Sequence, residues 1–360
     1  MKGQKIIKAF SGAVRVLVKT AVTMLAVVML LRMGEEINGN ELLTAFSERE
    51  RICVTLTDII SETTLEAPNE EPVSATEAVS ETTLSPPSGD DIRPVSEVHY
   101  VKTKTGYGDI YVKNGNSKHS IDIKEVLSQK PRCEIKTDGT YQVMIVHTHT
   151  SEGFSAEDRT WYSKKTAWRT QDKTKSVVAL GKIIADKLNS EGIKTLHVTD
   201  FHDYPKYNGA YDRAKETIKK YLKKYPSIQM VIDVHRDSMT QKDGTKLKPT
   251  AVINGRKAAQ VMIISGCNDT GKLDFPNWKY NLRMAVRLQK QLTEDWEGLA
   301  RPLYFAPFRY NMNLTDNSLL LEFGTEANTL EEAKYTAEMT GSSLAEVLKE
   351  YIVKEKEEKQ

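Results

Sequence analysis

The sequence contains little cysteine and almost no net charge, and each scarcity excludes a class of protein. Its three cysteines (Cys53, Cys133 and Cys267) are too few and too widely spaced for a disulfide framework or a cysteine-rich zinc module. Any metal site must therefore use histidine and carboxylate ligands. The 51 Lys and Arg residues nearly balance the 49 Asp and Glu residues, which leaves a net charge of +2. This balance argues against a nucleic-acid-binding protein, because such proteins usually carry a large basic excess.

Long apolar runs are scarce as well, and the one near the N-terminus is short. Residues 21–31 are apolar and follow a basic segment, but a membrane span needs about 20 apolar residues. A run extended back to Phe10 would reach that length, but it would contain Arg15 and Lys19. The long side chains of these two residues would then have to reach toward the lipid headgroups. No Ala-x-Ala-like cleavage site follows. We predict that residues 1–36 form an uncleaved single-pass anchor with a cytoplasmic N-terminus, in preference to a cleaved signal.

Both interpretations of the N-terminus place the rest of the chain outside the cytoplasm. Residues 37–60 are predicted to be a juxtamembrane segment with a short apolar periodicity. Residues 61–95 contain five of the twelve prolines, no aromatic residue, and eight acidic residues against Arg93 alone. Such a composition cannot offset the entropy of ordering the backbone, so we predict a disordered acidic linker. The composition becomes globular from about residue 96, and residues 96–360 are predicted to form the catalytic domain.

Hydrophobic periodicity in the globular region alternates between strand and helix. Strands are predicted at residues 141–146, 195–198, 230–234, 250–253, 260–265 and 318–323, and helices at 176–190, 211–225, 278–292 and 329–354. An Asn254-Gly255 turn should join two of the strands, and a capping box, Thr329 with Glu332, should open the last helix. This alternation predicts an α/β fold with a mostly parallel sheet covered by helices. Sites in such sheets lie at the carboxyl ends of the strands.

Three of these strand ends carry side chains of one chemical kind. The first leads into His149 and Glu152, the second into His235, and the third into Glu322. Two imidazoles and one carboxylate with an open position are what a catalytic zinc ion needs, and a further carboxylate can serve as general base. Each strand end taken alone is weak evidence for a metal site, since a histidine in the core is often a structural residue whose hydrogen bonds are all made within the protein. The three strand ends together predict a metal hydrolase.

Four phrases make the chain recognisable as a member of a family. They are VMIVHTHTSEGF (143–154), YNGAYDRAKETIKKYLKKYPSIQMVIDVHRDS (207–238), KPTAVINGRKAAQVMIISG (248–266) and LLLEFGTEANTLEEA (319–333). Over about residues 140–345 the chain resembles the stage II sporulation protein P family. These proteins are membrane-anchored cell-wall hydrolases of endospore-forming bacteria, with a catalytic domain similar to zinc N-acetylmuramoyl-L-alanine amidases.

The resemblance implies specific roles for the residues singled out above. It implies Zn²⁺ as cofactor, held by His149, Glu152 and His235, with Glu322 as catalytic acid/base. His147 lies in the same phrase as His149, and alternation along a strand does not choose between them, so His147 is left as the alternative ligand. Arg236 is a candidate to stabilise the oxyanion, although it could equally be a structural clamp that pairs with Asp237.

The resemblance also implies a substrate and partners. The substrate would be peptidoglycan, cleaved between the lactyl group and L-Ala and also at peptide cross-links, which would thin the septal wall during engulfment. The partners would be other engulfment proteins in the same cell membrane, reached through the N-terminal anchor, and nucleic acid would not be among them.

Two other functions fit part of the pattern. A zinc carboxypeptidase has its ligands in the same order, and Arg301 or Arg309 could then grip the free carboxylate of a stem peptide. A degenerate module that binds peptidoglycan without cutting it would not need all four site residues, which are present here.

Overall fold

The computed structural model describes residue 89 and residues 91–353. The predicted anchor (1–36), the juxtamembrane segment (37–60) and nearly all of the linker (61–95) therefore lie outside the described residues. The chain divides into two units, Met1–Thr64 and Leu65–Gln360, and every described residue belongs to the second. None of the described helices is long and apolar enough to cross a membrane.

The described region alternates between strands and helices, as the periodicity predicts. Its strands are β1 (Ile92–Val98), β2 (Thr105–Tyr107), β3 (Ile110–Asn114), β4 (Val143–Val146), β5 (Trp161–Ser163), β6 (Thr195–His197), β7 (Met230–Asp237), β8 (Lys246–Ile253), β9 (Arg256–Ala259), β10 (Val261–Gly266), β11 (Leu303–Ala306) and β12 (Leu319–Thr325). Its helices are α3 (Ile123–Ser128), α4 (Val177–Ser190), α5 (Ala210–Lys224), α6 (Trp278–Asp295), α7 (Leu330–Lys349) and the short 3-10 helix η1 (Met312–Leu314).

Several boundaries follow directly from local chemistry. Ser176 caps α4, with its hydroxyl oxygen accepting from the amide of Val178. The predicted capping box at the start of α7 is confirmed, because Thr329 and Glu332 each bond the other's backbone amide. The Asn254-Gly255 turn joins β8 to β9, and not to the strand predicted at residues 260–265, which is the separate β10.

The main sheet has eight strands in the order β2-β3-β11-β10-β12-β7-β4-β6. Strands β12, β7, β4 and β6 run parallel to one another, and β10, β11 and β3 form a second parallel group. The two groups meet where β10 runs antiparallel to β12, and β2 pairs antiparallel with β3 at the edge. The prediction of a mostly parallel sheet is therefore wrong, and the sheet is mixed. The reversal arises because the unit β10–α6–β11 enters the sheet in the opposite direction to the β4, β7 and β12 strands.

A second, smaller sheet has the order β5-β1-β8-β9 and is also mixed. Strand β1 begins at Ile92 and pairs with β5 and β8, so the last residues of the predicted linker are folded. The folded region therefore starts slightly earlier than residue 96. The extended backbone of β1 forms because β5 pairs with residues 92–94 and β8 pairs with residues 95–98.

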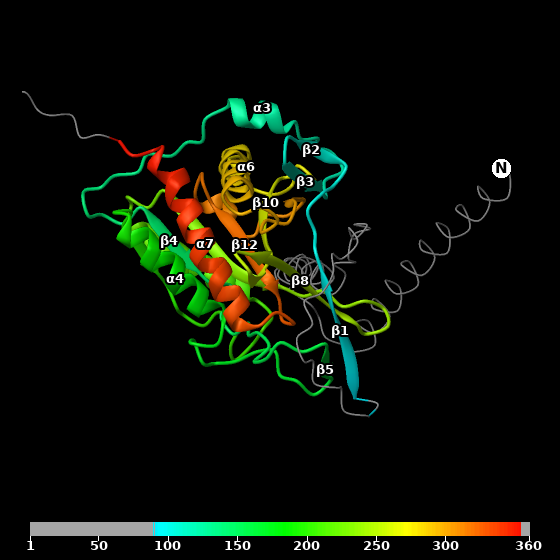
Figure 1. Ribbon diagram of the computed structural model, residues 1–360. Coiled ribbons are helices and arrows are strands. Elements are labelled where there is room, and N and C mark those ends of the chain that lie inside the picture. Colours follow the sequence, from blue (N-terminus) through cyan, green and yellow to red (C-terminus); the bar gives the residue numbers. More distant parts are fainter. Residues whose placement is uncertain (1–88, 90, 354–360) are drawn as a thin grey trace, which may run out of the picture. The chain divides into compact units, whose positions relative to one another are not determined.

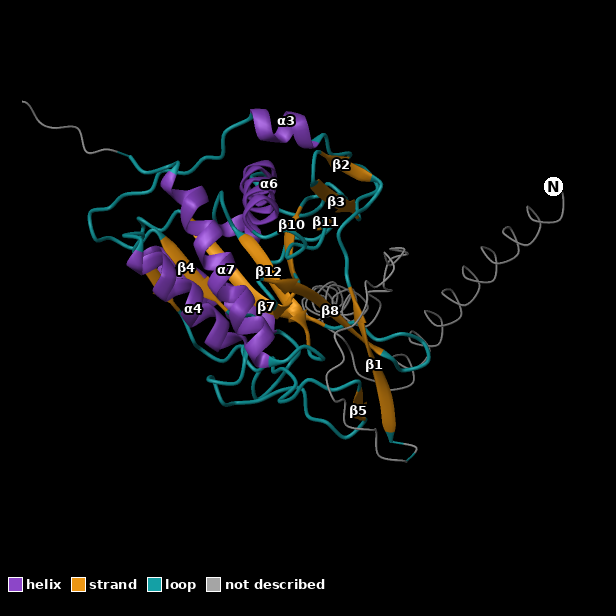
Figure 2. Cartoon of the chain, viewed as in Figure 1, coloured by secondary structure: helices purple, strands orange, loops and turns teal. Residues whose placement is uncertain are grey.

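Helices cover both faces of the main sheet. Figures 1 and 2 show α4, α6 and α7 against one face, and the largest apolar core lies there, with Val143, Ile145, Ile232 and Val234 pointing into it. On the opposite face, Ile218 of α5 packs in a smaller cluster with Met144, Val146 and Val231. Successive residues of β4 and of β7 therefore point alternately to the two faces of the sheet.

Candidate metal-dependent active site

The predicted site lies on the α5 face of the sheet, at the carboxyl end of the parallel group of strands. On β7, Ile232 and Val234 fill the large core, so His235 points to the other face. Glu322 of β12 is the residue paired with His235 in the register of these two strands. The reversal of β10 leaves this relationship intact, because β4, β7 and β12 all belong to one parallel group.

The first sequence phrase reaches the same place through a turn. Strand β4 ends at Val146, and the amide of Glu152 donates to the carbonyl of His149 (3.1 Å), which closes the turn. Thr148 is bound to Asp233 of β7, through its amide (2.8 Å) and its hydroxyl (2.5 Å). The turn therefore delivers His149 and Glu152 to the face that carries His235.

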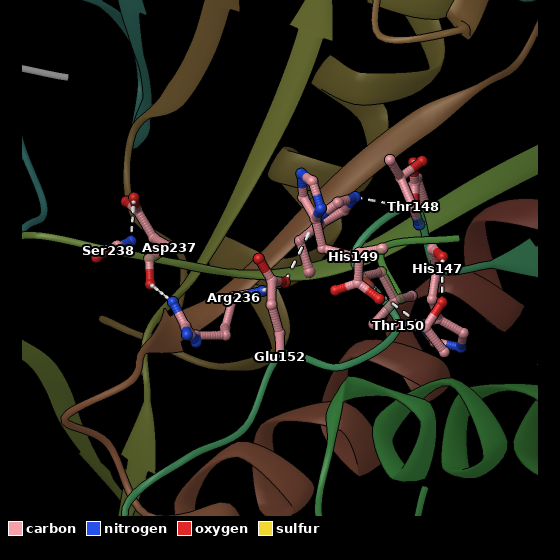
Figure 3. A network of polar contacts seen from close by, with 12 residues as sticks. His147, Thr148, His149, Thr150, Glu152, Arg236, Asp237 and Ser238 are labelled. Atoms are coloured by element: carbon pink, nitrogen blue, oxygen red, sulfur yellow. Dashed lines mark hydrogen bonds and ion pairs between the residues drawn. The ribbon is translucent and has the colours of Figure 1, made fainter. Parts of the chain in front are cut away.

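The three predicted ligands come together in the structure. Nδ1 of His235 lies 3.4 Å from Oε2 of Glu152, and the rings of His149 and His235 are 5.3 Å apart between centroids, at 80°. All three side chains are buried. Figure 3 shows His149 and Glu152 close together on the segment that follows β4, with Arg236 and Asp237 on the neighbouring strand. Residues that are more than 80 positions apart in sequence thus share one small volume.

His147 is not part of this group. Its Nδ1 lies 3.1 Å from the carbonyl oxygen of Val234, and its Nε2 lies 2.9 Å from Nε2 of His197. Because a carbonyl only accepts, Nδ1 carries the proton and Nε2 accepts from His197. Figure 3 shows His147 turned toward the helices and away from Glu152. Both ring nitrogens are occupied on the α4 face, so the geometry favours His149 as the ligand.

Electrostatics within the group are dominated by the carboxylates around His235. Burial lowers the pKa of His235, but Asp233 and Glu152 outweigh it and hold that pKa well above the usual value. Burial raises the pKa of Glu152, but the contact with His235 brings it down to about 2. The site thus concentrates negative charge around one imidazole, an environment that favours a cation.

Glu322 has a different environment, although it is the strand neighbour of His235. Its Oε2 atom is buried and, among the described residues, has no hydrogen-bond partner. Burial raises the pKa of Glu322 to about 8, and the carboxylates of Asp237 and Glu152 push it the same way against His235 and Arg301. A carboxyl with a pKa near neutrality is suited to accept and return a proton.

The contacts of Arg236 favour the structural role over the oxyanion role. Its guanidinium donates to the carbonyls of Gly153 (3.0 Å), Trp168 (3.2 Å) and Asp237 (3.2 Å). Its backbone amide donates to Oε2 of Glu152 (3.1 Å). Arg236 therefore braces the segment after β4 and orients one candidate ligand. The carboxylate of Asp237 pairs with Arg301 (2.9 Å) and not with Arg236.

Aromatic side chains that the sequence did not single out as a group line the site. The ring of Tyr207 stacks on His149 (4.6 Å, 11°), and its hydroxyl lies 3.3 Å from Nε2 of that histidine. Tyr211, at the start of α5, contacts both His149 and His235, and Tyr310 packs against Tyr211. The spacing of these tyrosines along the sequence does not identify them as a group, because they come from two separate loops and from the first turn of a helix.

The donor set fits a divalent metal. Within the part of the chain that the structure describes, no group of three or more His, Cys, Asp or Glu side chains is already arranged to hold an ion. Two imidazoles and a carboxylate nevertheless converge here, as in catalytic zinc sites, and a second carboxyl lies beside them. The fit therefore rests on the chemistry of the donors His149, Glu152 and His235.

Comparison with known families assigns the chain. The model of the family described as stage II sporulation protein P matches residues 65–349. The chain belongs to the stage II sporulation protein P family. A relative, the stage II sporulation protein P of Bacillus subtilis (strain 168), is 28% identical over 238 residues, which cover 61% of this chain and 54% of the relative. The match thus spans about half of the relative's length.

The solved structures to which this chain is similar include amidases. N-acetylmuramoyl-L-alanine amidase AmiC2 of Nostoc punctiforme is 10% identical, with a TM-score of 0.35, and the match covers 58% of this chain and 96% of that one. The CwlD amidase of Clostridioides difficile, in complex with the GerS lipoprotein, is 14% identical, with a TM-score of 0.35 and coverages of 58% and 98%.

Proposed function

We propose that this member of the family is a zinc-dependent N-acetylmuramoyl-L-alanine amidase that acts on peptidoglycan. The observation that carries the proposal is the convergence of His149, Glu152 and His235 with Glu322, which is the strand partner of His235. His149, Glu152 and His235 would hold the metal. When bound, zinc would supply Lewis acidity that activates water and polarises a carbonyl.

Glu322 carries the proton transfers of the proposed hydrolysis. Water adds to the lactyl carbonyl carbon, and Glu322 accepts the proton that this water loses. The bond from that carbon to the nitrogen of L-Ala then breaks, and Glu322 returns the proton to the leaving amine. The products are the lactyl carboxylate and a stem peptide with a free N-terminus. Burial raises the pKa of Glu322 to about 8 in the metal-free protein, and a bound cation nearby would lower that pKa toward neutral, where the carboxyl can both accept and return a proton.

The wider role follows the family and the sequence outside the described residues. We propose an enzyme held in the cell membrane by residues 1–36, with its catalytic domain outside the cytoplasm. There it would thin septal peptidoglycan during engulfment, together with other proteins of that process. Endopeptidase activity on cross-links belongs to the same proposal, because the same site would hydrolyse a peptide bond by the same proton transfers.

The test uses the full chain in detergent with purified peptidoglycan. Mass spectrometry should detect stem peptides with a free L-Ala N-terminus. These products should disappear with a chelator, return with added zinc, and be absent for Glu322→Gln. Shortened stems on an intact lactyl linkage would instead support the carboxypeptidase. One of its two candidate arginines is already engaged, since Arg301 is buried and pairs with Asp237.

A further inference from the structure

One buried carboxylate contacts both segments that supply the proposed metal ligands. Asp233 lies two residues before His235 on β7 and faces the same side of the sheet. Its Oδ1 lies 2.9 Å from Nε2 of His235. The same carboxylate accepts the amide of Thr148 at Oδ1 (2.8 Å) and the hydroxyl of Thr148 at Oδ2 (2.5 Å). Thr148 is the neighbour of His149.

We propose that Asp233 is the positioning residue of the metal site, orienting His235 so that Nδ1 serves as the ligand atom and holding the turn that carries His149 through the backbone amide of Thr148. The inference rests on the proposed metal-dependent function and names no new ligand. The sequence did not single out Asp233, because an aspartate in a buried strand has no motif of its own. The spacing of two residues indicates a contact with His235 only once both residues are known to lie in a strand, where this spacing places their side chains on one face.

The two nitrogens of His235 have separate neighbours, which is why the orientation matters. Nε2 faces Asp233, and Nδ1 faces Glu152, the carboxylate ligand. A carboxylate beside one nitrogen keeps the proton there, so that the lone pair of the other nitrogen is directed at the metal. Nε2 of His235 lies close to Oδ1 of Asp233, but the pair does not have the straight geometry of a hydrogen bond, so the attraction between the ring N–H and the negative carboxylate is mainly electrostatic. Its effect should therefore depend on the charge of Asp233.

Charge and shape can be separated by two substitutions. Asp233→Asn keeps the size and one accepting oxygen, and the hydroxyl of Thr148 can turn to accept from the new amide, so mainly the charge is lost. Thr148→Val is the matched control: it removes the hydroxyl bond to Asp233 and leaves both the amide bond and the carboxylate next to His235. Only Asp233→Asn should change zinc binding through its effect on His235.

Zinc affinity is measured by competition with a chromogenic chelator, on the full chain in detergent. Asp233→Asn should weaken zinc binding about 10–100-fold, the usual effect of removing such a partner, and Thr148→Val should change it less than about threefold. Melting of the zinc-free proteins shows whether either change acts only on folding. Equal affinity in Asp233→Asn and the unmodified protein would overturn the inference, as would equal losses in both variants.

A measurement on the unmodified protein keeps the inference testable if Asp233→Asn does not fold. In the zinc-loaded protein labelled with ¹⁵N-histidine, NMR should find His235 with a proton on Nε2 and none on Nδ1. A proton on Nδ1 would overturn the proposal. The outcomes also separate the two proposals. If the unmodified protein binds no zinc, both proposals are wrong. If it binds zinc and Asp233→Asn binds zinc equally well, only the role of Asp233 is wrong.

Discussion

Glu322 and His235 are direct neighbours across two parallel strands, with β12 and β7 in a register that pairs them. Neighbouring strands are about 4.8 Å apart, and both residues sit inside their strands and not in loops. The proposed general base is therefore held against a proposed ligand by the backbone bonds of the sheet. Such a base keeps its position when the surrounding loops move, which is the arrangement a proton transfer requires.

Replacing Glu322 with Gln should abolish activity without destabilising the protein. The substitution keeps the shape but removes the proton acceptor, and loss of a general base typically costs about 10²–10⁴-fold in rate. The measurement is the rate of stem-peptide release. Glu331→Gln is the matched control, because Glu331 is exposed at the start of α7, where it pairs with Lys334. This control should retain full activity.

The stability of Glu322→Gln provides a second readout with a defined sign. The folded protein raises the pKa of Glu322 from 4.5 to about 8, so it binds this proton more tightly than the unfolded chain does. The contribution of Glu322 to the stability of the metal-free protein should therefore fall as pH rises from about 4.5 to 8. Glu322→Gln lacks this loss and should melt higher than the unmodified protein at pH 8. A variant that melts lower there would contradict the buried position of this carboxyl.

Much of the fold was predictable, because strong periodicity marks the core elements. The strands that became β4, β7 and β12 are short apolar runs buried on both faces, and the helices α4 and α7 carry clear caps. Strand direction was not predictable, because periodicity is the same for a strand of either direction. Strand β11 was missed because Pro302 and Pro307 flank the short apolar run Leu303–Ala306, and proline on both sides of a short run is typical of a loop.

The grouping of the candidate site residues was predictable to a similar extent. His149, Glu152, His235 and Glu322 stood out because a titratable residue at the end of an apolar strand needs a reason. The choice between His147 and His149 depends on where β4 ends: a strand continuing to 149 would have pointed both the same way, and a turn after Val146 separates them. Tyr207 and Tyr211 could not be assigned, since no pattern links a loop to the opposite strands.

Zinc stoichiometry should distinguish the two histidines of the first phrase. His149→Gln removes a proposed ligand and should reduce bound zinc to well below one per chain. His147→Gln should retain one zinc, because His147 bonds Val234 and His197 on the other side of the sheet. Metal analysis after dialysis measures both. The assignment of His149 fails if His147→Gln is the variant that loses its zinc.

The buried His147 and the half-buried His197 should together contribute a loss of stability in acid. Burial lowers the pKa of His147 to about 3, and it lowers the pKa of His197 to about 4. These two rings thus bind fewer protons in the folded protein than in the unfolded chain below about pH 6.5, so the stability that they contribute above that pH is lost as pH falls toward 4. Between pH 6.5 and 5 the pair should cost about 1–3 kcal/mol.

Urea unfolding at both pH values measures this loss, and His197→Gln should reduce it. The variant removes one titrating ring, although His147 remains buried and continues to contribute. Comparing the change between the two pH values cancels whatever the substitution does to stability at neutral pH. An undiminished pH dependence in His197→Gln would show that other groups cause the acid sensitivity.

A glycine on α4 makes room for this histidine pair, and adding a methyl group there should be costly. A Cβ atom at Gly181 would lie 2.6 Å from Cε1 and Nε2 of His147 and 2.8 Å from Nε2 of His197. Both rings are fixed by their mutual bond, so Gly181→Ala should destabilise the protein by about 1–3 kcal/mol despite the better helix propensity of alanine. Gly341→Ala on α7 is the matched control. Its new methyl group would lie 3.2 Å from Cβ of Lys187 and 3.4 Å from Cα of Ile184, which are milder approaches than those at Gly181, so Gly341→Ala should destabilise the protein less than Gly181→Ala. Urea unfolding of both variants decides the matter, because similar stabilities would mean that the histidine pair can shift and is not held in place by the helix.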